Sequence, residues 1–160
     1  MCPDCGRPLS DHDRHVRFTL PDAVLNAAID LDSDGFWMSH DTARESVFLS
    51  SEGLGSFVRA LLPVHLTGGY AVTYGVWIEL SPDDAQHAFD VWFAPSYAEL
   101  TIEGRLANAI APWDVLDAPV HLAVRDPDET PYCVSSQSPE MSNLLSDVWA
   151  HDLVLSTLPD

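Results

Sequence analysis

Apolar residues alternate with other residues over several short segments, which is the spacing of strands with one buried face. The clearest segment is Tyr70–Leu80, where the residues on one face are Tyr70, Val72, Tyr74, Val76, Ile78 and Leu80. Trp77 falls on the opposite face. Further strands are predicted over residues 46–51, 56–66, 97–106, 120–125 and 132–136. Glycine pairs at 53/55 and 68/69 predict tight connections on either side of the second of these strands.

Helical spacing of apolar residues follows three capping signals. The first helix is predicted to begin near Pro21 and to run to about Leu31. The second spans about Pro82–Phe93, because Ser81 supplies a capping oxygen and Pro82 suits the first helical position. The motif Ser138-Pro139-Glu140 repeats this pattern and predicts a final helix that runs to about Leu155.

Strands in a run, a helix, further strands and a last helix indicate the α+β class rather than alternating βαβ units. The prediction is an antiparallel sheet of about five to six strands with two main helices packed on it. A length of 160 residues suits one domain over 1–160. Within that domain, residues 1–18 are expected to form a metal-clipped segment and 19–160 the α+β core.

The charge is strongly negative, with a formal net charge of -18 at pH 7. Such a surface repels nucleic acid and anionic lipid, so neither is expected as a partner. Two interpretations stay open: the charge attracts a basic protein, or it only keeps the chain soluble. Hydrophobic residues make up 46% of the sequence, which is enough for a packed core despite this charge.

All seven basic residues are arginine, since the sequence contains no lysine. This excludes a phosphate-binding loop with a catalytic lysine and any Schiff-base lysine. No apolar run reaches the length of a membrane span, and the start of the chain does not resemble a signal peptide, so a cytoplasmic location is expected. In that reducing compartment the three cysteines are expected to bind metal or to be buried.

The first residues carry the strongest chemical signal. Cys2 and Cys5 are separated by two residues, and His12 and His15 follow shortly after. Thiolates and imidazoles are the ligands that tetrahedral Zn²⁺ prefers, and the cysteine spacing is that of a zinc knuckle. The two histidines stand closer together than in most zinc sites, so the two cysteines are the firmer ligands. His15 or a distant residue, such as His40 or Cys133, is expected to complete the set.

A second candidate cation site lies in an acidic segment. Asp30, Asp32 and Asp34 alternate before Gly35, and Asp41 stands at the last position of a twelve-residue loop, as in an EF-hand that binds Ca²⁺. The final aspartate is shorter than the glutamate usual there. The alternative interpretation is a solvated acidic turn.

Trp77 and Glu79 form a candidate partner surface, because both alternate with the apolar face of their strand. If that face of the sheet is uncovered, an exposed tryptophan beside a carboxylate marks a contact site. The alternative is that Trp77 belongs to the core.

Several motifs together resemble a bacterial family known as domain of unknown function 2199. They are Cys2-x-x-Cys5-Gly6, Phe57-Val58-Arg59, Pro63-Val64, Gly75-Val76-Trp77-Ile78-Glu79-Leu80-Ser81, Trp92, Tyr97, Gly104, Leu106 and Asn108. The resemblance covers most of the chain and makes it a divergent member. It implies a shared fold and no activity, because the family has no established function.

These features favour a small acidic zinc-binding domain that binds a partner and catalyses no reaction. Two alternatives remain. The first is an immunity or inhibitor protein that masks a basic toxin or a nucleic-acid-binding surface. The second is a zinc-dependent hydrolase, which needs three protein ligands and an open position for water. No catalytic motif of an established class is present in the sequence.

Overall fold

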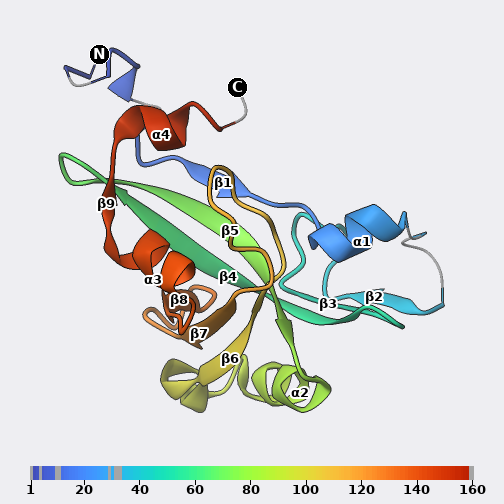
Figure 1. Cartoon of the computed structure of the whole chain (residues 1–160). Coiled ribbons are helices and arrows are strands. Elements are labelled where there is room, and N and C mark those ends of the chain that lie inside the picture. Colours follow the sequence, from blue (N-terminus) through green and yellow to red (C-terminus); the bar gives the residue numbers. More distant parts are fainter. Residues whose placement is uncertain (1, 4, 10–11, 29, 31–33, 159–160) are drawn as a thin grey trace.

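The computed structural model describes residues 2–3, 5–9, 12–28, 30 and 34–158, and the description below refers to these. They form a sheet of nine strands with four α-helices and one short 3-10 helix around it (Figure 1). In chain order the elements are β1 (His15–Arg17), α1 (Asp22–Ala27), β2 (Phe36–Met38), β3 (Phe48–Ser51), β4 (Gly55–Leu66), β5 (Tyr70–Leu80), α2 (Pro82–Val91), η2 (Pro95–Glu99), β6 (Thr101–Leu106), β7 (Pro119–Ala123), β8 (Tyr132–Ser135), α3 (Pro139–Ser146), β9 (Val148–Trp149) and α4 (His151–Leu155).

Five of the strands close into a barrel. Strands β4 to β8 pair with their neighbours in chain order, and each is antiparallel to the next. Helix α2 lies in the connection between β5 and β6. The ring closes where β8 meets β4 in parallel, at Leu61 and Tyr132. Closure removes two edges that an open sheet would leave unpaired.

The prediction of a purely antiparallel sheet of five to six strands is wrong, although the broad α+β class is confirmed. Strand β1 runs parallel to β5, and strands β8 and β9 run parallel to β4, although β8 is antiparallel to its other partner, β7. The cause is the length of β4 and β5, which extend well beyond the barrel seam. Part of the edge of each strand is therefore available for pairing. Short strands from distant parts of the sequence pair there, β1 with β5 and β9 with β4.

The alternation along β5 is confirmed by burial on both of its faces. Val72, Val76 and Ile78 lie in the main hydrophobic core, inside the barrel and under α3 and α4. Trp77 faces the other way and is also fully buried, in a second cluster with Phe57. The interpretation of Trp77 as part of an exposed partner surface is therefore wrong, because other chain segments cover this outer face, contributing Leu20, Val24, Phe36, Ala43 and Ala107.

Arg59 holds this second layer onto the barrel. Its guanidinium is buried, lies 4.1 Å from the ring centroid of Trp77, and donates hydrogen bonds to five backbone carbonyls. The acceptors belong to Phe18, Thr19, Ala43, Ser46 and Gly75. Burial, with added repulsion from Arg17 and Arg44, lowers the pKa of Arg59 to about 9, so the group stays cationic at neutral pH. One side chain thus ties the chain before α1 and the loop before β3 to the sheet.

Both serine caps are confirmed. Ser81 Oγ accepts from the backbone N–H of Asp84, and Ser138 Oγ accepts from that of Met141. The helices nevertheless end earlier than predicted: α1 at Ala27 and α2 at Val91. The predicted end of the first helix at Leu31 lies outside the described residues.

The long final helix predicted to about Leu155 is wrong. Asp147 adopts an extended conformation after α3, and β9 then pairs with the end of β4 before α4 begins. Burial of α4 explains the break. The two extended residues of β9 let the chain turn, so that α4 packs over the hairpin that joins β4 and β5 and buries His151, Val154 and Leu155. The break has a chemical consequence, since α4 begins with His151. No helix in the described part of the chain has the length and apolar character needed to cross a membrane.

Candidate metal centre

The N-terminal residues form a tight turn that presents two thiols. The Cys2 N–H donates to the carbonyl of Arg7 at 2.8 Å, and the Gly6 N–H donates to the carbonyl of Cys2 at 2.9 Å. Gly6 has a φ of +72°, a conformation that glycine adopts without the steric cost of a side chain. The turn therefore explains why glycine follows Cys5.

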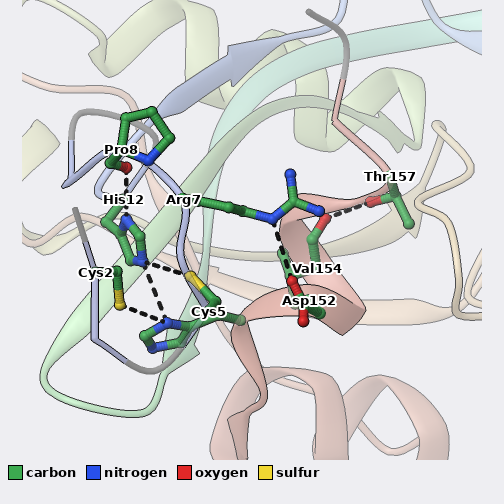
Figure 2. A network of polar contacts seen from close by, with 9 residues as sticks. Cys2, Cys5, Arg7, Pro8, His12, Asp152, Val154 and Thr157 are labelled. Atoms are coloured by element: carbon green, nitrogen blue, oxygen red, sulfur yellow. Dashed lines mark hydrogen bonds and ion pairs between the residues drawn. The ribbon is translucent and has the colours of Figure 1, made fainter.

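Four potential metal ligands come together at this turn: Cys2, Cys5, His12 and His151. Their ligand atoms all lie within 4.8 Å of one another. The Sγ of Cys2 is 3.4 Å from Nδ1 of His151, and the Sγ of Cys5 is 3.6 Å from Nε2 of His12. The two histidine nitrogens are 3.2 Å apart. Figure 2 shows Cys2, Cys5 and His12 from the N-terminal segment pointing toward one another.

These separations match the edges of a tetrahedron around one metal ion. With metal–sulfur bonds of about 2.3 Å and metal–nitrogen bonds of about 2.0 Å, the edges measure about 3.3 Å between nitrogens and about 3.5 Å between nitrogen and sulfur. Three of the six separations, one between nitrogens and two between nitrogen and sulfur, fall within about 0.2 Å of these values. The group could therefore hold a metal ion, and its donor set is compatible with zinc.

Hydrogen bonds on the far side of each ring set the histidine tautomers. His12 Nδ1 lies 3.2 Å from the carbonyl oxygen of Pro8, and His151 Nε2 lies 2.6 Å from that of Thr67. A carbonyl only accepts, so these two nitrogens carry the hydrogen. In the neutral rings, His12 Nε2 and His151 Nδ1 are then acceptors, and each lies beside a cysteine thiol, at 3.6 Å from Cys5 Sγ and 3.4 Å from Cys2 Sγ. A carbonyl that accepts from the far nitrogen of the ring is also typical of metal-bound histidines.

The centre is largely shielded from water. Cys2, His12 and His151 are buried, and Cys5 is half-buried. The ring of Tyr70 packs against both histidines, with centroids 4.6 Å from His12 and 5.8 Å from His151. Desolvation raises the pKa of the Cys5 thiol, and the neighbouring Cys2 adds to the effect. Without a cation the thiol form is favoured there, whereas a bound metal would stabilise the thiolate.

An ion pair closes the rim of the site. Arg7 Nε donates to Asp152 Oδ1 at 3.2 Å, and both residues flank ligands in the sequence (Figure 2). The pair is partly solvent-exposed and therefore contributes at most about 1 kcal/mol. Its effect is to orient the N-terminal turn on α4.

The predicted ligand set agrees with this cluster in three of its four members. Cys2, Cys5 and His12 take part, whereas His15 lies exposed on β1 and does not. The reason is strand pairing: β1 runs beside β5 and carries the chain away from the turn. Neither distant alternative takes part, because Cys133 is buried in β8, where burial raises its pKa to about 12, and His40 packs beside Ser39.

His151 was not predicted, since 139 residues separate it from His12. One signal in the sequence points to it: His151 lies inside the predicted final helix, beside Asp152 in an otherwise apolar stretch. However, the position of His151 in the sequence does not reveal which residues lie near it in the folded protein.

The predicted calcium residues do not form a comparable group. Asp30, Asp34 and Asp41 are all exposed, and Asp32 lies outside the described residues. Among the residues that the structure describes, the cluster at the N-terminal turn is the one group of histidine, cysteine or acidic side chains close enough together to hold a metal ion. The calcium site therefore stays a prediction.

Comparison with known proteins gives a family and no activity. Neither the curated proteins nor the solved structures contain a match to this chain. A bacterial protein family matches residues 1–146, which include three of the four clustered ligands and the whole barrel but not His151. The chain belongs to the family described as "Uncharacterized protein conserved in bacteria (DUF2199)".

Proposed function

We propose that Cys2, Cys5, His12 and His151 bind one Zn²⁺ ion, and that this ion is structural. The observation that carries the proposal is the meeting of two thiols and two imidazole nitrogens, whose ligand atoms all lie within 4.8 Å of one another. A mixed sulfur and nitrogen donor set at tetrahedral spacing suits Zn²⁺, whereas Ca²⁺ and Mg²⁺ prefer oxygen ligands.

Four protein ligands favour a closed coordination shell. A hydrolytic zinc site keeps one position for water, so it uses three protein ligands. In this cluster a fourth side chain occupies the remaining corner, and three of the four residues are buried. These features support a non-catalytic role and argue against the zinc-dependent hydrolase considered from the sequence.

The ion would join two parts of the fold that are distant in the sequence, and a third part would support them. The N-terminal turn supplies Cys2, Cys5 and His12, and α4 supplies His151. The hairpin between β4 and β5 supports them through the carbonyl of Thr67 and the ring of Tyr70. The proposed function is therefore a zinc-stabilised domain in which the metal holds residues 2–12 and α4 on the barrel.

The test is metal content by plasma mass spectrometry on protein purified without chelator. We expect about one zinc per chain. A Cys2→Ser/Cys5→Ser double variant and a His151→Ala variant should lose it. His15→Ala is the matched control, because His15 is exposed on β1 and should leave the zinc content unchanged.

Cobalt substitution separates a closed shell from an open one. Co²⁺ in a tetrahedral site with two thiolates gives intense visible absorption, and a weakly competing external ligand such as azide changes it where a position is open. We expect no change on adding azide. Loss of zinc in His15→Ala but not in His151→Ala would overturn the ligand assignment, and an azide-induced change would overturn the structural role.

A further inference from the structure

An apolar groove lies at the end of the barrel opposite the metal centre. It runs between α2 and the β2–β3 hairpin and has a volume of about 380 Å³. Figure 1 places α2 at one end of the molecule and α4, which carries His151, at the other. The groove is therefore a separate feature from the cluster described above.

Aromatic side chains line this groove and remain exposed. Trp37 on β2 is 47% exposed and Phe89 on α2 is 50% exposed, and their rings meet edge to face at 5.9 Å. Phe48 lies behind them, 5.5 Å from Phe89. Large apolar residues with half their surface in water, gathered around a concavity, are typical of contact sites in which an inserted side chain becomes buried.

A second groove continues from the first and is acidic. It has a volume of about 430 Å³ and shares Ser56 and Pro82 with the aromatic groove. Glu79, Asp84 and Glu103 line it, opposed by Arg105. Helix α2 adds Asp83 and Asp90 at its exposed surface, and residues 81–104 contain no arginine or lysine. The aromatic groove thus opens directly onto a region of negative charge.

We propose that these two grooves together bind a basic segment of another protein, with an apolar side chain between Trp37 and Phe89 and lysine or arginine side chains along Glu79, Asp84 and Glu103. The apolar groove would supply affinity by burial, and the carboxylates would select for positive charge and steer the approach. Glu79, predicted from the sequence as a contact residue, keeps this role, and Trp37 takes the place that Trp77 cannot fill.

Charge complementarity selects this occupant among the alternatives. A second copy of the chain also carries a net charge of -18, so two copies repel each other at long range. Nucleic acid is disfavoured for the same reason. A neutral apolar peptide would leave the three carboxylates without partners. A basic segment with an apolar residue matches both grooves at once.

The experiment uses the full-length, zinc-replete protein and a fluorescently labelled peptide of alternating lysine and leucine residues. Two matched peptides isolate the contributions: one replaces every leucine by serine, and the other replaces every lysine by glutamate. Binding is followed by fluorescence anisotropy at low and high salt, and sedimentation reports the oligomeric state of the protein. Zinc content is measured on each variant, so failure of the docking proposal is distinguished from failure of the metal site.

We expect saturable binding of the lysine–leucine peptide that weakens with salt. Phe89→Ser and Trp37→Ser should each weaken it about tenfold, as is usual for a central apolar contact. Glu79→Gln/Glu103→Gln should weaken it and reduce its salt dependence. Leu153→Ser is the matched control, because Leu153 is 41% exposed but lies on α4, away from both grooves.

Several results would overturn the proposal. One is equal binding of the glutamate–leucine or the lysine–serine peptide, and another is binding that the groove variants leave unchanged. The absence of saturable binding up to the solubility of the peptide would also reject it. Dimers of the wild type that Phe89→Ser dissociates would identify a second copy as the occupant instead.

Discussion

His12 Nε2 and His151 Nδ1 lie 3.2 Å apart, and the other nitrogen of each ring faces a backbone carbonyl. This relationship fixes both tautomers and directs two lone pairs at one point. It also joins the first residues of the described chain to its last helix. A metal ion bound here as proposed would cross-link the fold across 139 residues, so its removal should act on stability as the opening of a long loop does.

Chelation should destabilise the protein and release α4. Cross-links across loops of this length contribute about 5 kcal/mol by restricting the unfolded chain, although proton binding to the freed ligands changes the value. We expect a strong chelator to lower the free energy of unfolding in urea by an amount of this order. Hydrogen exchange should accelerate in residues 148–158 before it does in β4 and β5. The Cys2→Ser/Cys5→Ser variant is the control and should not respond to chelator; an unchanged wild type would contradict the expectation.

Arg59→Met should be strongly destabilising. The substitution removes one donor from each of five backbone carbonyls while keeping an unbranched apolar side chain. The carbonyls of Gly75 and Thr19 keep a second donor, the Phe18 N–H and Trp77 Nε1. The expected loss is about 3 kcal/mol, because a buried acceptor left without a donor retains its desolvation cost. Urea denaturation measures it. Arg105→Met removes an exposed arginine and should change stability by less than about 0.5 kcal/mol.

Gly104→Ala should also be destabilising, for a steric reason. A Cβ added at Gly104 would lie 2.5 Å from the carbonyl oxygen of Glu79 and 2.6 Å from Ile78 Cγ2. The first contact is with backbone in the adjacent strand, so β5 and β6 must separate; overpacking of this kind costs about 1–3 kcal/mol. In Gly35→Ala, the added Cβ instead meets the exposed, flexible side chain of Glu52 at 3.1 Å. Thermal unfolding should rank Gly104→Ala well below Gly35→Ala, and equal values would contradict the packing described.

Tyr97 should ionise only in strong alkali. Burial, reinforced by the nearby Glu129 carboxylate, raises the pKa of Tyr97 from its usual value of about 10 to about 12. The folded protein therefore retains a proton that the unfolded chain releases. Stability from this group is present below pH 10 and is lost as the pH rises through 12. The tyrosinate absorbance that disappears in Tyr97→Phe should titrate near pH 12; titration near 10 would show that the phenol is exposed.

Local signals predicted most of the elements because each rests on neighbouring residues. Alternation over Tyr70–Leu80 depends on the period of a strand, and the caps at Ser81 and Ser138 depend on one oxygen and one proline. All three were found as predicted. The three-residue strands β1 and β2 were missed, since so short a segment contains no full period. Their existence depends on the free edges of β5 and β3.

The metal ligands divide in the same way. Cys2 and Cys5 are recognisable because both are on one turn, whereas His151 reaches the site only through the pairing of β9 with β4. The sequence leaves the exposure of Trp77 undecided for a related reason. Alternation reveals that a strand has two faces, but not whether another layer covers the second one. Arg59, buried beneath that layer, gave no signal of its role as a multiple donor.

The pairing of β4 at its edge implies a further effect of metal binding. One side of this twelve-residue strand pairs with β5 along its whole length, while the other side is filled in succession by β3, β8 and β9. The last of these is two residues long and precedes the ligand His151. If zinc anchors α4 as proposed, its loss lets β9 detach and leaves the backbone of His65 and Leu66 unpaired beside an apolar core. An unpaired edge of this kind accepts strands from other molecules, so zinc would protect the protein from aggregation as well as from unfolding.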